Sequence, residues 1–115
     1  MIVSRLAHVE VSSAIVRQGY AAGLESSIIE ATLAEIDADF SELLEVIELS
    51  RPLLSRALQL ARRHRLRAAD SIQLASVFEA RELTQADEFV VVCCDVELNG
   101  AARAEQMAVL DPSQP

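Results

Sequence analysis

The sequence contains no tryptophan and no lysine, and it has only one tyrosine and three phenylalanines among 115 residues. Because aromatic side chains are scarce while 51% of the residues are hydrophobic, the core must be built mainly from leucine, isoleucine, valine and alanine. Glycine and proline are also rare, and the sequence has no Gly/Ser-rich linker or internal repeat. We therefore expect residues 1–115 to form a single domain, which suits a chain of this length.

Long hydrophobic runs are absent, since the longest are short segments such as Phe89 to Cys94, and the N-terminus lacks the pattern of a secretory signal. These absences predict a soluble, cytoplasmic protein with no membrane partner. The two cysteines, Cys93 and Cys94, are adjacent in an expected strand, where neighbouring side chains point to opposite faces. They are a poor disulfide pair and lack metal-ligand spacing, so we expect reduced thiols in the core.

Negative charge dominates, with a net charge of −8, and all ten basic residues are arginine. Such a chain repels nucleic acid at long range, so RNA binding would require a local basic patch or bound metal ions. One basic cluster exists, at Arg62, Arg63, His64, Arg65 and Arg67. It is either a solvated helix end, where the helix dipole favours cations, or a contact for RNA through Arg65 and Arg67.

Apolar periodicity and turn residues predict helices that alternate with short strands. We expect helices at 6–20, 26–39, 52–64, 68–83 and 97–105, and strands at 2–4, 43–49, 89–94 and 107–110. Ser26 or Ser27 is the expected cap of the second helix, and Pro52 fits the first turn of the third. The continuous apolar run at 89–94 predicts a strand buried on both faces. This alternation is typical of an α/β domain with a mostly parallel sheet.

Three acidic residues stand where a carboxylate has no obvious packing role. Asp95 directly follows the apolar run at 89–94, and sites in open α/β sheets form beyond the carboxyl ends of strands. Asp70 has the apolar Leu74 four residues later, and Glu10 stands among small apolar residues on its own helix. Each acid has an ordinary alternative, namely helix capping for Asp95, the helix dipole for Asp70 and pairing with arginine. Three such acids from three segments nevertheless indicate convergence on a metal.

The residues around these acids resemble the motifs of a known family. The sequence reads VSRLAHVEV at 3–11, LRAADSIQLA at 66–75 and VVCCDVELNGAA at 91–102. In this order and spacing, the three segments resemble the second, third and fourth acidic motifs of PIN-domain ribonucleases, in particular the VapC-like toxins of type II toxin–antitoxin systems. The ordered set is more specific than any one motif.

The resemblance implies a PIN-like (Rossmann-like) three-layer α/β fold with a small, mostly parallel sheet. It also implies an endoribonuclease that depends on Mg²⁺ or Mn²⁺ and is held inactive by an antitoxin protein. Glu10, Asp70 and Asp95 would be its catalytic, metal-binding acids, which fits the preference of hard cations for oxygen ligands. A serine and histidine pair is not required for this chemistry.

The chain also departs from the family pattern. The segment with the first acid and the N-terminal strand is not present, and loss of that central strand would expose a sheet edge that favours a homodimer or partner capture. Cys93 takes a position that is often Ser or Thr, and would be auxiliary to the site. Asn99 either supplies an extra oxygen or is a surface polar residue. Gln106 stands where a helix-ending glycine is common.

Three functional hypotheses remain. The first is a metal-dependent ribonuclease, which would be inactive unless the first acid is supplied. The second is a non-catalytic PIN-derived module that binds an antitoxin-like partner or self-associates, which the missing acid and the net charge favour. The third is an unrelated small α/β enzyme whose acids cap helices and form salt bridges. The acidic residues between 25 and 48 should face solvent, and we assign no catalysis to His8 or His64.

Overall fold

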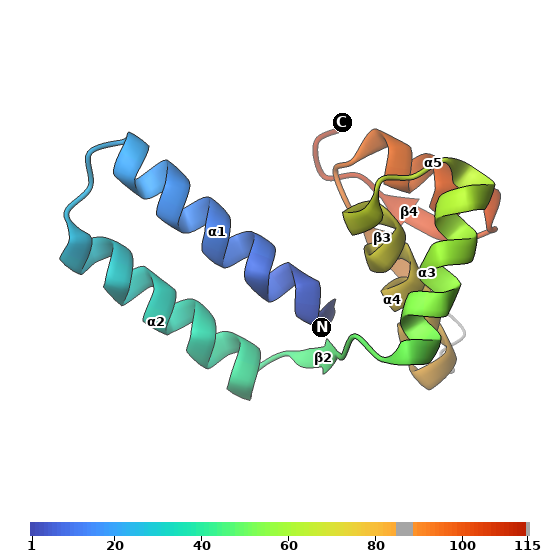
Figure 1. Cartoon of the computed structure of the whole chain (residues 1–115), viewed down its shortest axis with the longest axis horizontal. Helices are drawn as coiled ribbons and strands as arrows, with labels where there is room; N and C mark the ends of the chain where they lie inside the picture. The colour runs from blue at the N-terminus through green and yellow to red at the C-terminus, as the bar shows by residue number, and fades with distance from the viewer. Residues whose placement is uncertain (85–88, 115) are drawn as a thin grey trace. The chain divides into compact units, whose positions relative to one another are not determined.

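The computed structural model describes residues 1–84 and 89–114 and is mostly helical (Figure 1). Its elements in chain order are β1 (Ile2–Ser4), α1 (Arg5–Ala21), α2 (Ser26–Glu42), β2 (Glu45–Ile47), α3 (Arg51–His64), α4 (Ala68–Thr84), β3 (Val90–Val92), α5 (Val96–Ala104) and β4 (Ala108–Leu110). The chain divides into two compact units, Met1–Leu49 and Ser50–Pro115.

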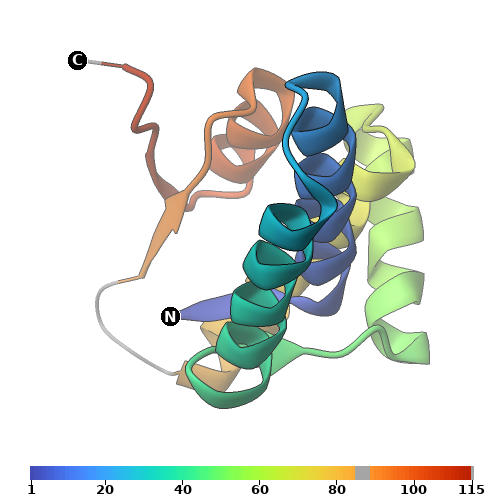
Figure 2. The same ribbon diagram turned by 90° about the vertical axis from the view of Figure 1, so that its left-hand side faces the viewer.

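The first unit is a helical hairpin on a pair of parallel strands. Helices α1 and α2 lie side by side in both ribbon views (Figures 1 and 2). Strand β1 pairs with β2, with Val3 opposite Val46. Ser4 ends β1 and begins α1, because its hydroxyl accepts a hydrogen bond from the Ala7 N–H over 3.2 Å. At the hairpin, Gly23 takes a φ of 77°, a conformation that glycine adopts without strain.

The start of α2 differs from the prediction. Neither Ser26 nor Ser27 caps the helix, since Ser26 is its first helical residue and Glu25 precedes it without a side-chain capping bond. The Ser26 hydroxyl lies instead 3.4 Å from the Tyr20 hydroxyl, across the turn of the hairpin. The predicted cap was therefore wrong because a contact between the two helices holds this hydroxyl.

The second unit has α3 and α4 packed against each other, with Leu53, Leu60 and Leu74 among its buried side chains. Ser50 caps α3 by accepting a hydrogen bond from the Leu53 N–H over 3.2 Å, and Pro52 lies in the first turn as predicted. The helix ends at His64, and the next residue, Arg65, has a left-handed φ of 55°.

Strands β3 and β4 pair in parallel, with Val91 opposite Val109. The predicted burial of the 89–94 strand on both faces is wrong, because Val91 is 6% exposed but Val90 and Val92 are 53% and 64% exposed. Alternate side chains of a strand point to opposite faces, and within the described residues only the face that carries Val91 is covered.

The prediction of an α/β chain with parallel strand pairing is confirmed. The strands of residues 1–84 and 89–114 form two separate two-stranded sheets, where the sequence predicted one mostly parallel sheet. Over these same ranges, none of the helices has the length and apolar character needed to cross a lipid bilayer.

Candidate functional site

Asp95 lies in the turn between β3 and α5 and is exposed. It caps α5, because its Oδ1 accepts a hydrogen bond from the Leu98 N–H over 2.8 Å. The capping role that the sequence offered as an alternative is therefore confirmed. The bond occupies one carboxylate oxygen and fixes the side chain at the carboxyl end of β3, where α/β sheets place their sites.

Asp70 lies in the first turn of α4 and is half-buried. Its neighbour Ser71 is buried and donates a hydrogen bond from its hydroxyl to the Ala68 carbonyl over 2.8 Å. This hydrogen bond lies within the first turn of α4, the turn that carries Asp70. The negative charge of Asp70 at this helix start is favourable, because the N-terminal end of a helix carries partial positive charge.

The Cys93 thiol lies within electrostatic reach of both acids. Burial raises the pKa of this thiol, and the Asp95 N–H, which donates to the Cys93 sulfur over 3.3 Å, partly opposes the rise. The charges of Asp95 and Asp70 raise the same pKa further. Two carboxylates from different elements of the second unit thus act on one side chain at the end of β3. Both cysteines are free, but Cys94 is exposed, so its assignment to the core was wrong.

Asn99 belongs to the same turn. It is 1% exposed, so the surface position that the sequence offered as an alternative is wrong. Its Nδ2 donates to the Cys93 carbonyl over 2.8 Å, which joins α5 to the end of β3. Its Oδ1 is buried and has no hydrogen-bond donor within the part of the chain that the structure describes. An unpaired buried amide oxygen fits a site that receives a cation or an ordered water.

Glu10, the third predicted acid, lies on α1 in the first unit and is exposed. Among residues 1–84 and 89–114, no group of three or more His, Cys, Asp and Glu side chains lies close enough together to hold a metal ion. Asp95, Cys93 and Asn99 lie in one turn of the second unit and are joined by hydrogen bonds. Asp70 lies in the same unit, at the start of α4.

The basic cluster lies at the C-terminal end of α3. Arg63 and His64 both bond to Oε1 of Glu105, which follows α5, and His64 Nε2 lies 2.9 Å from that oxygen. The hydrogen bond with His64, followed by that from Arg63, lowers the pKa of Glu105 against the effect of burial. Arg65 and Arg67 are exposed. The cluster therefore has a structural part, at Arg63 and His64, and a part that faces solvent.

A shallow hollow adjoins the exposed part of the basic cluster. Its volume is about 430 Å³, and it is lined by His64, Arg65, Val96, Glu97, Gly100 and Ala101. Because both Glu97 and Arg65 line it, the hollow is electrostatically mixed. It does not form a uniformly basic surface for a phosphate chain.

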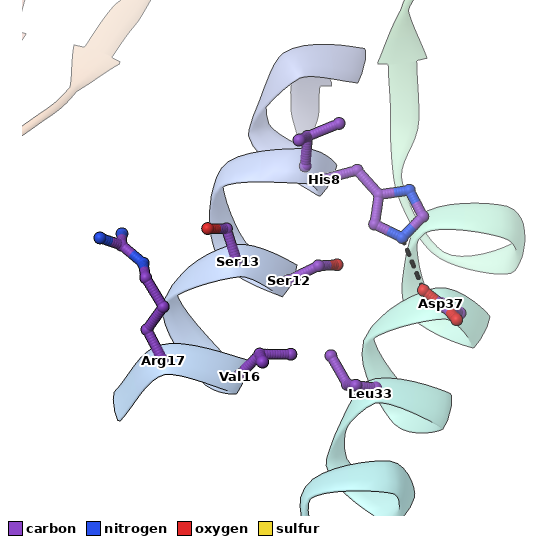
Figure 3. A pocket seen from close by; sticks show the side chains of 8 residues that line it. His8, Ser12, Ser13, Val16, Arg17, Leu33 and Asp37 are labelled. Carbon is purple, nitrogen blue, oxygen red and sulfur yellow. Dashed lines mark hydrogen bonds and ion pairs between the residues drawn. The ribbon is translucent and has the colours of Figure 1, made fainter. Parts of the chain in front are cut away.

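The first unit has a larger open pocket, of about 590 Å³, between α1 and α2 (Figure 3). The residues around it are His8, Val9, Ser12, Ser13, Val16 and Arg17 of α1 and Leu33 and Asp37 of α2. His8 Nε2 lies 2.7 Å from Asp37 Oδ1, and the His8 ring stacks on Phe40 with centroids 4.3 Å apart. The sequence did not predict this pocket, because the pairing of the two helices that forms it depends on the tertiary fold.

Comparison with protein-family models, with curated proteins and with solved structures found no match.

Proposed function

We propose that this protein is a metal-dependent endoribonuclease of the PIN type, with Asp70 and Asp95 as ligands of Mg²⁺ or Mn²⁺. The observation that supports the proposal is the position of Asp95 in the turn at the carboxyl end of β3, where α/β sheets place their sites. The motifs that contain these acids resemble those of PIN-domain ribonucleases, as does the segment around Glu10.

The ligands that we propose in the second unit are oxygen atoms, which hard cations prefer. Mg²⁺ is commonly held by one or two carboxylates together with waters and substrate phosphate, and the buried Asn99 oxygen adds an oxygen to this turn. When bound, the cation would polarise the scissile phosphodiester and lower the pKa of the attacking water. Asp95 is held in place by its capping bond to the Leu98 N–H.

Arg65 and Arg67 are the groups that we assign to the RNA backbone. Both are exposed and follow α3, immediately before the helix that carries Asp70. Arginine binds phosphate through planar, paired N–H groups, so two side chains suffice for a local contact on an otherwise acidic chain. Glu97 in the adjoining hollow limits how far this positive surface extends.

Cleavage of a single-stranded RNA oligonucleotide by the full chain tests the proposal. We expect cleavage in Mn²⁺ or Mg²⁺, none after chelation by EDTA, and a loss of at least about 100-fold in Asp70→Asn and in Asp95→Asn, the range in which loss of metal ligation or its supporting shell lowers activity. Glu30→Gln is the matched control, because it removes an exposed acid of α2 that takes no part in the proposed site. Equal cleavage by all four proteins would show a contaminating nuclease and refute the proposal.

The second candidate is a non-catalytic interaction module, and the charge distribution favours it. Residues 1–49 contain nine of the eighteen acidic residues but only Arg5 and Arg17 of the ten arginines. The pocket between α1 and α2 has apolar Val9, Val16 and Leu33 in its lining. An apolar pocket on an acidic hairpin suits a basic amphipathic helix, the kind of segment with which an antitoxin-like partner would bind.

Sedimentation of the full chain tests whether the same surface mediates self-association. If it does, the wild-type chain sediments as a dimer and Val9→Glu, which places a charge on the exposed rim of the pocket, sediments as a monomer. A dimer that Val9→Glu leaves intact would exclude this surface as the contact between copies.

A further inference from the structure

We propose that the pocket between α1 and α2 binds the outer face of α3 in a second copy of this chain. This outer face consists of Arg51, Leu54, Leu58 and Arg62. The inference rests on the second candidate function, the interaction module, and names the segment that occupies its pocket. It is independent of the ribonuclease proposal. Two exposed apolar surfaces of opposite charge support it.

Helix α3 carries apolar side chains on two opposite sides. Leu53, Ala57 and Leu60 are buried on one side, whereas Leu54 and Leu58 are 43% and 54% exposed. Residues four apart in a helix lie on the same side, so the two exposed leucines form a short apolar row. A row of this spacing is the kind of anchor with which an amphipathic helix binds in a groove.

Arginines lie at both ends of this leucine row. Arg51 precedes Leu54 by about one turn, and Arg62 follows Leu58 by about one turn. Both arginines are exposed, and neither forms an ion pair within residues 1–84 and 89–114. The outer face of α3 is therefore apolar in the middle and basic at its ends.

The pocket has the complementary character. Its apolar lining includes Val9 and Val16, which are 62% and 36% exposed, and Leu33, toward which Val16 points (Figure 3). The exposed acids Glu30 and Asp37 lie about one turn before and after Leu33 along α2. The pocket is therefore apolar in the middle and acidic at its α2 ends.

The two apolar surfaces also agree in length. Leu54 and Leu58 are about 6 Å apart along the axis of α3, and Val9 and Val16 are about 10 Å apart along α1. Both leucines therefore fit within the apolar part of the pocket, and the arginines extend beyond it toward the acids.

Charge favours this pairing over the other two that the same surfaces allow. Two pockets in contact would bring two acidic hairpins together, since residues 1–49 hold nine acids and two arginines. Two outer faces in contact would bring Arg51 and Arg62 of both copies together. Only a pocket against an outer face joins opposite charges, and like charges across an interface oppose association.

Sedimentation velocity of the full chain over a concentration series tests the inference, with the folding of each variant checked by circular dichroism. We expect the wild-type chain to self-associate. Val9→Glu and Leu58→Glu should each weaken self-association by at least about tenfold, because each places an unpaired charge in the apolar contact. Leu43→Glu is the matched control and should equal the wild type, since Leu43 is 74% exposed and lies outside both surfaces.

A mixture of the two variants identifies which surfaces meet. Val9→Glu retains an intact outer face, and Leu58→Glu retains an intact pocket. The mixture should therefore form a complex that contains both variants, at concentrations at which each variant alone is monomeric. Absence of this complex from a mixture of folded variants would overturn the inference.

Arg17 also lines the pocket and should repel an occupant that carries arginines. We expect Arg17→Gln to tighten self-association by about two- to fivefold, the range of a single exposed charge interaction. Weaker self-association in Arg17→Gln would contradict an occupant that carries arginines.

The same series distinguishes failure of this inference from failure of the interaction module. If Val9→Glu is monomeric while Leu58→Glu still self-associates, the pocket is a contact between copies and only the role of α3 is refuted. If the wild-type chain is monomeric at every concentration, self-association is refuted and the role of α3 with it.

Discussion

Single side chains in the turn between β3 and α5 combine structural and chemical roles. Asp95 caps a helix through one oxygen and is a proposed metal ligand, while Asn99 bonds to the strand through its nitrogen and leaves its oxygen unpaired. A position of this kind must be tested with substitutions that keep one role and remove the other.

Asp95 offers such a pair of substitutions. Asparagine and aspartate cap helices about equally well, so Asp95→Asn should change the free energy of unfolding by less than about 0.5 kcal/mol, whereas Asp95→Ala should lose about 1 kcal/mol. Urea denaturation of the full chain measures both. A loss in Asp95→Asn as large as that in Asp95→Ala would show that the charge of Asp95, and not its cap, stabilises the unit.

The backbone conformation of Gln106 should lower the free energy of unfolding. Its φ of 65° is left-handed, which costs a residue with a Cβ atom about 1–2 kcal/mol, part of which glycine avoids. We expect Gln106→Gly to stabilise the chain by about 0.5–1 kcal/mol in urea denaturation. Gln18→Gly, at an exposed position within α1, is the control and should destabilise by about 1 kcal/mol. Destabilisation by both substitutions would contradict the left-handed conformation at position 106.

Glu105 should make stability depend on pH. Its folded-state pKa is lowered by His64 and Arg63, so it lies below the value of about 4.3 in an unfolded chain. The stabilisation is therefore complete above that unfolded value and is lost as the pH falls through the folded-state pKa. We expect Glu105→Gln to destabilise by about 1 kcal/mol at pH 7 and by less at pH 3, which lies below the unfolded-state pKa.

Urea denaturation at the two pH values measures this difference, with Glu97→Gln as the matched control on the exposed face of α5. A loss in Glu105→Gln that is the same at pH 3 and pH 7 would exclude ionic stabilisation by Glu105.

At the scale of elements, local sequence signals predicted most boundaries. Pro52 and the apolar spacing of α3 placed that helix within a residue of its observed start, and α4 and α5 were predicted nearly as closely. The errors came from tertiary contacts, because Ser26 turns toward Tyr20 and one face of β3 remains exposed. Neither outcome is encoded in a window of a few residues.

Two helix glycines give opposite predictions. A Cβ atom on the buried Gly19 of α1 would lie 2.9 Å from Ile29 Cγ1, whereas one on Gly100 of α5 would meet no atom within 4 Å. We expect Gly19→Ala to destabilise by about 1–3 kcal/mol through overpacking and Gly100→Ala to stabilise by up to about 1 kcal/mol through helix propensity. Thermal or urea unfolding measures both, and stabilisation by both would contradict the close packing of α1 on α2.

The residues of the candidate site were predictable only in part, because local sequence patterns do not contain tertiary contacts. The apolar run at 89–94 predicted that Asp95 follows a strand. The helix pattern predicted that Asp70 lies in the first turn of a helix. The burial of Asn99, the pairing of His8 with Asp37 and the pocket beside them were not predicted. All three depend on side chains from elements that are distant in the sequence.

At the scale of the whole molecule, charge is distributed unequally. Residues 1–49 carry most of the net negative charge, while eight of the ten arginines lie in residues 50–115. The unit that contains Asp70 and Asp95 is thus nearly neutral, and a phosphate chain would meet far less long-range repulsion there than on the first unit. The single PIN-like domain expected from the sequence remains a prediction for the complete chain.

Thermal unfolding with increasing MnCl₂ tests most directly whether Asp70 and Asp95 share a cation. A ligand that binds only the folded chain stabilises it by about 2.7 kcal/mol at one hundred times its dissociation constant, which raises the midpoint by roughly ten degrees. We predict this rise for the wild-type chain and Glu97→Gln, and its loss in Asp70→Asn and in Asp95→Asn. A rise that persists in both aspartate variants would contradict a shared site.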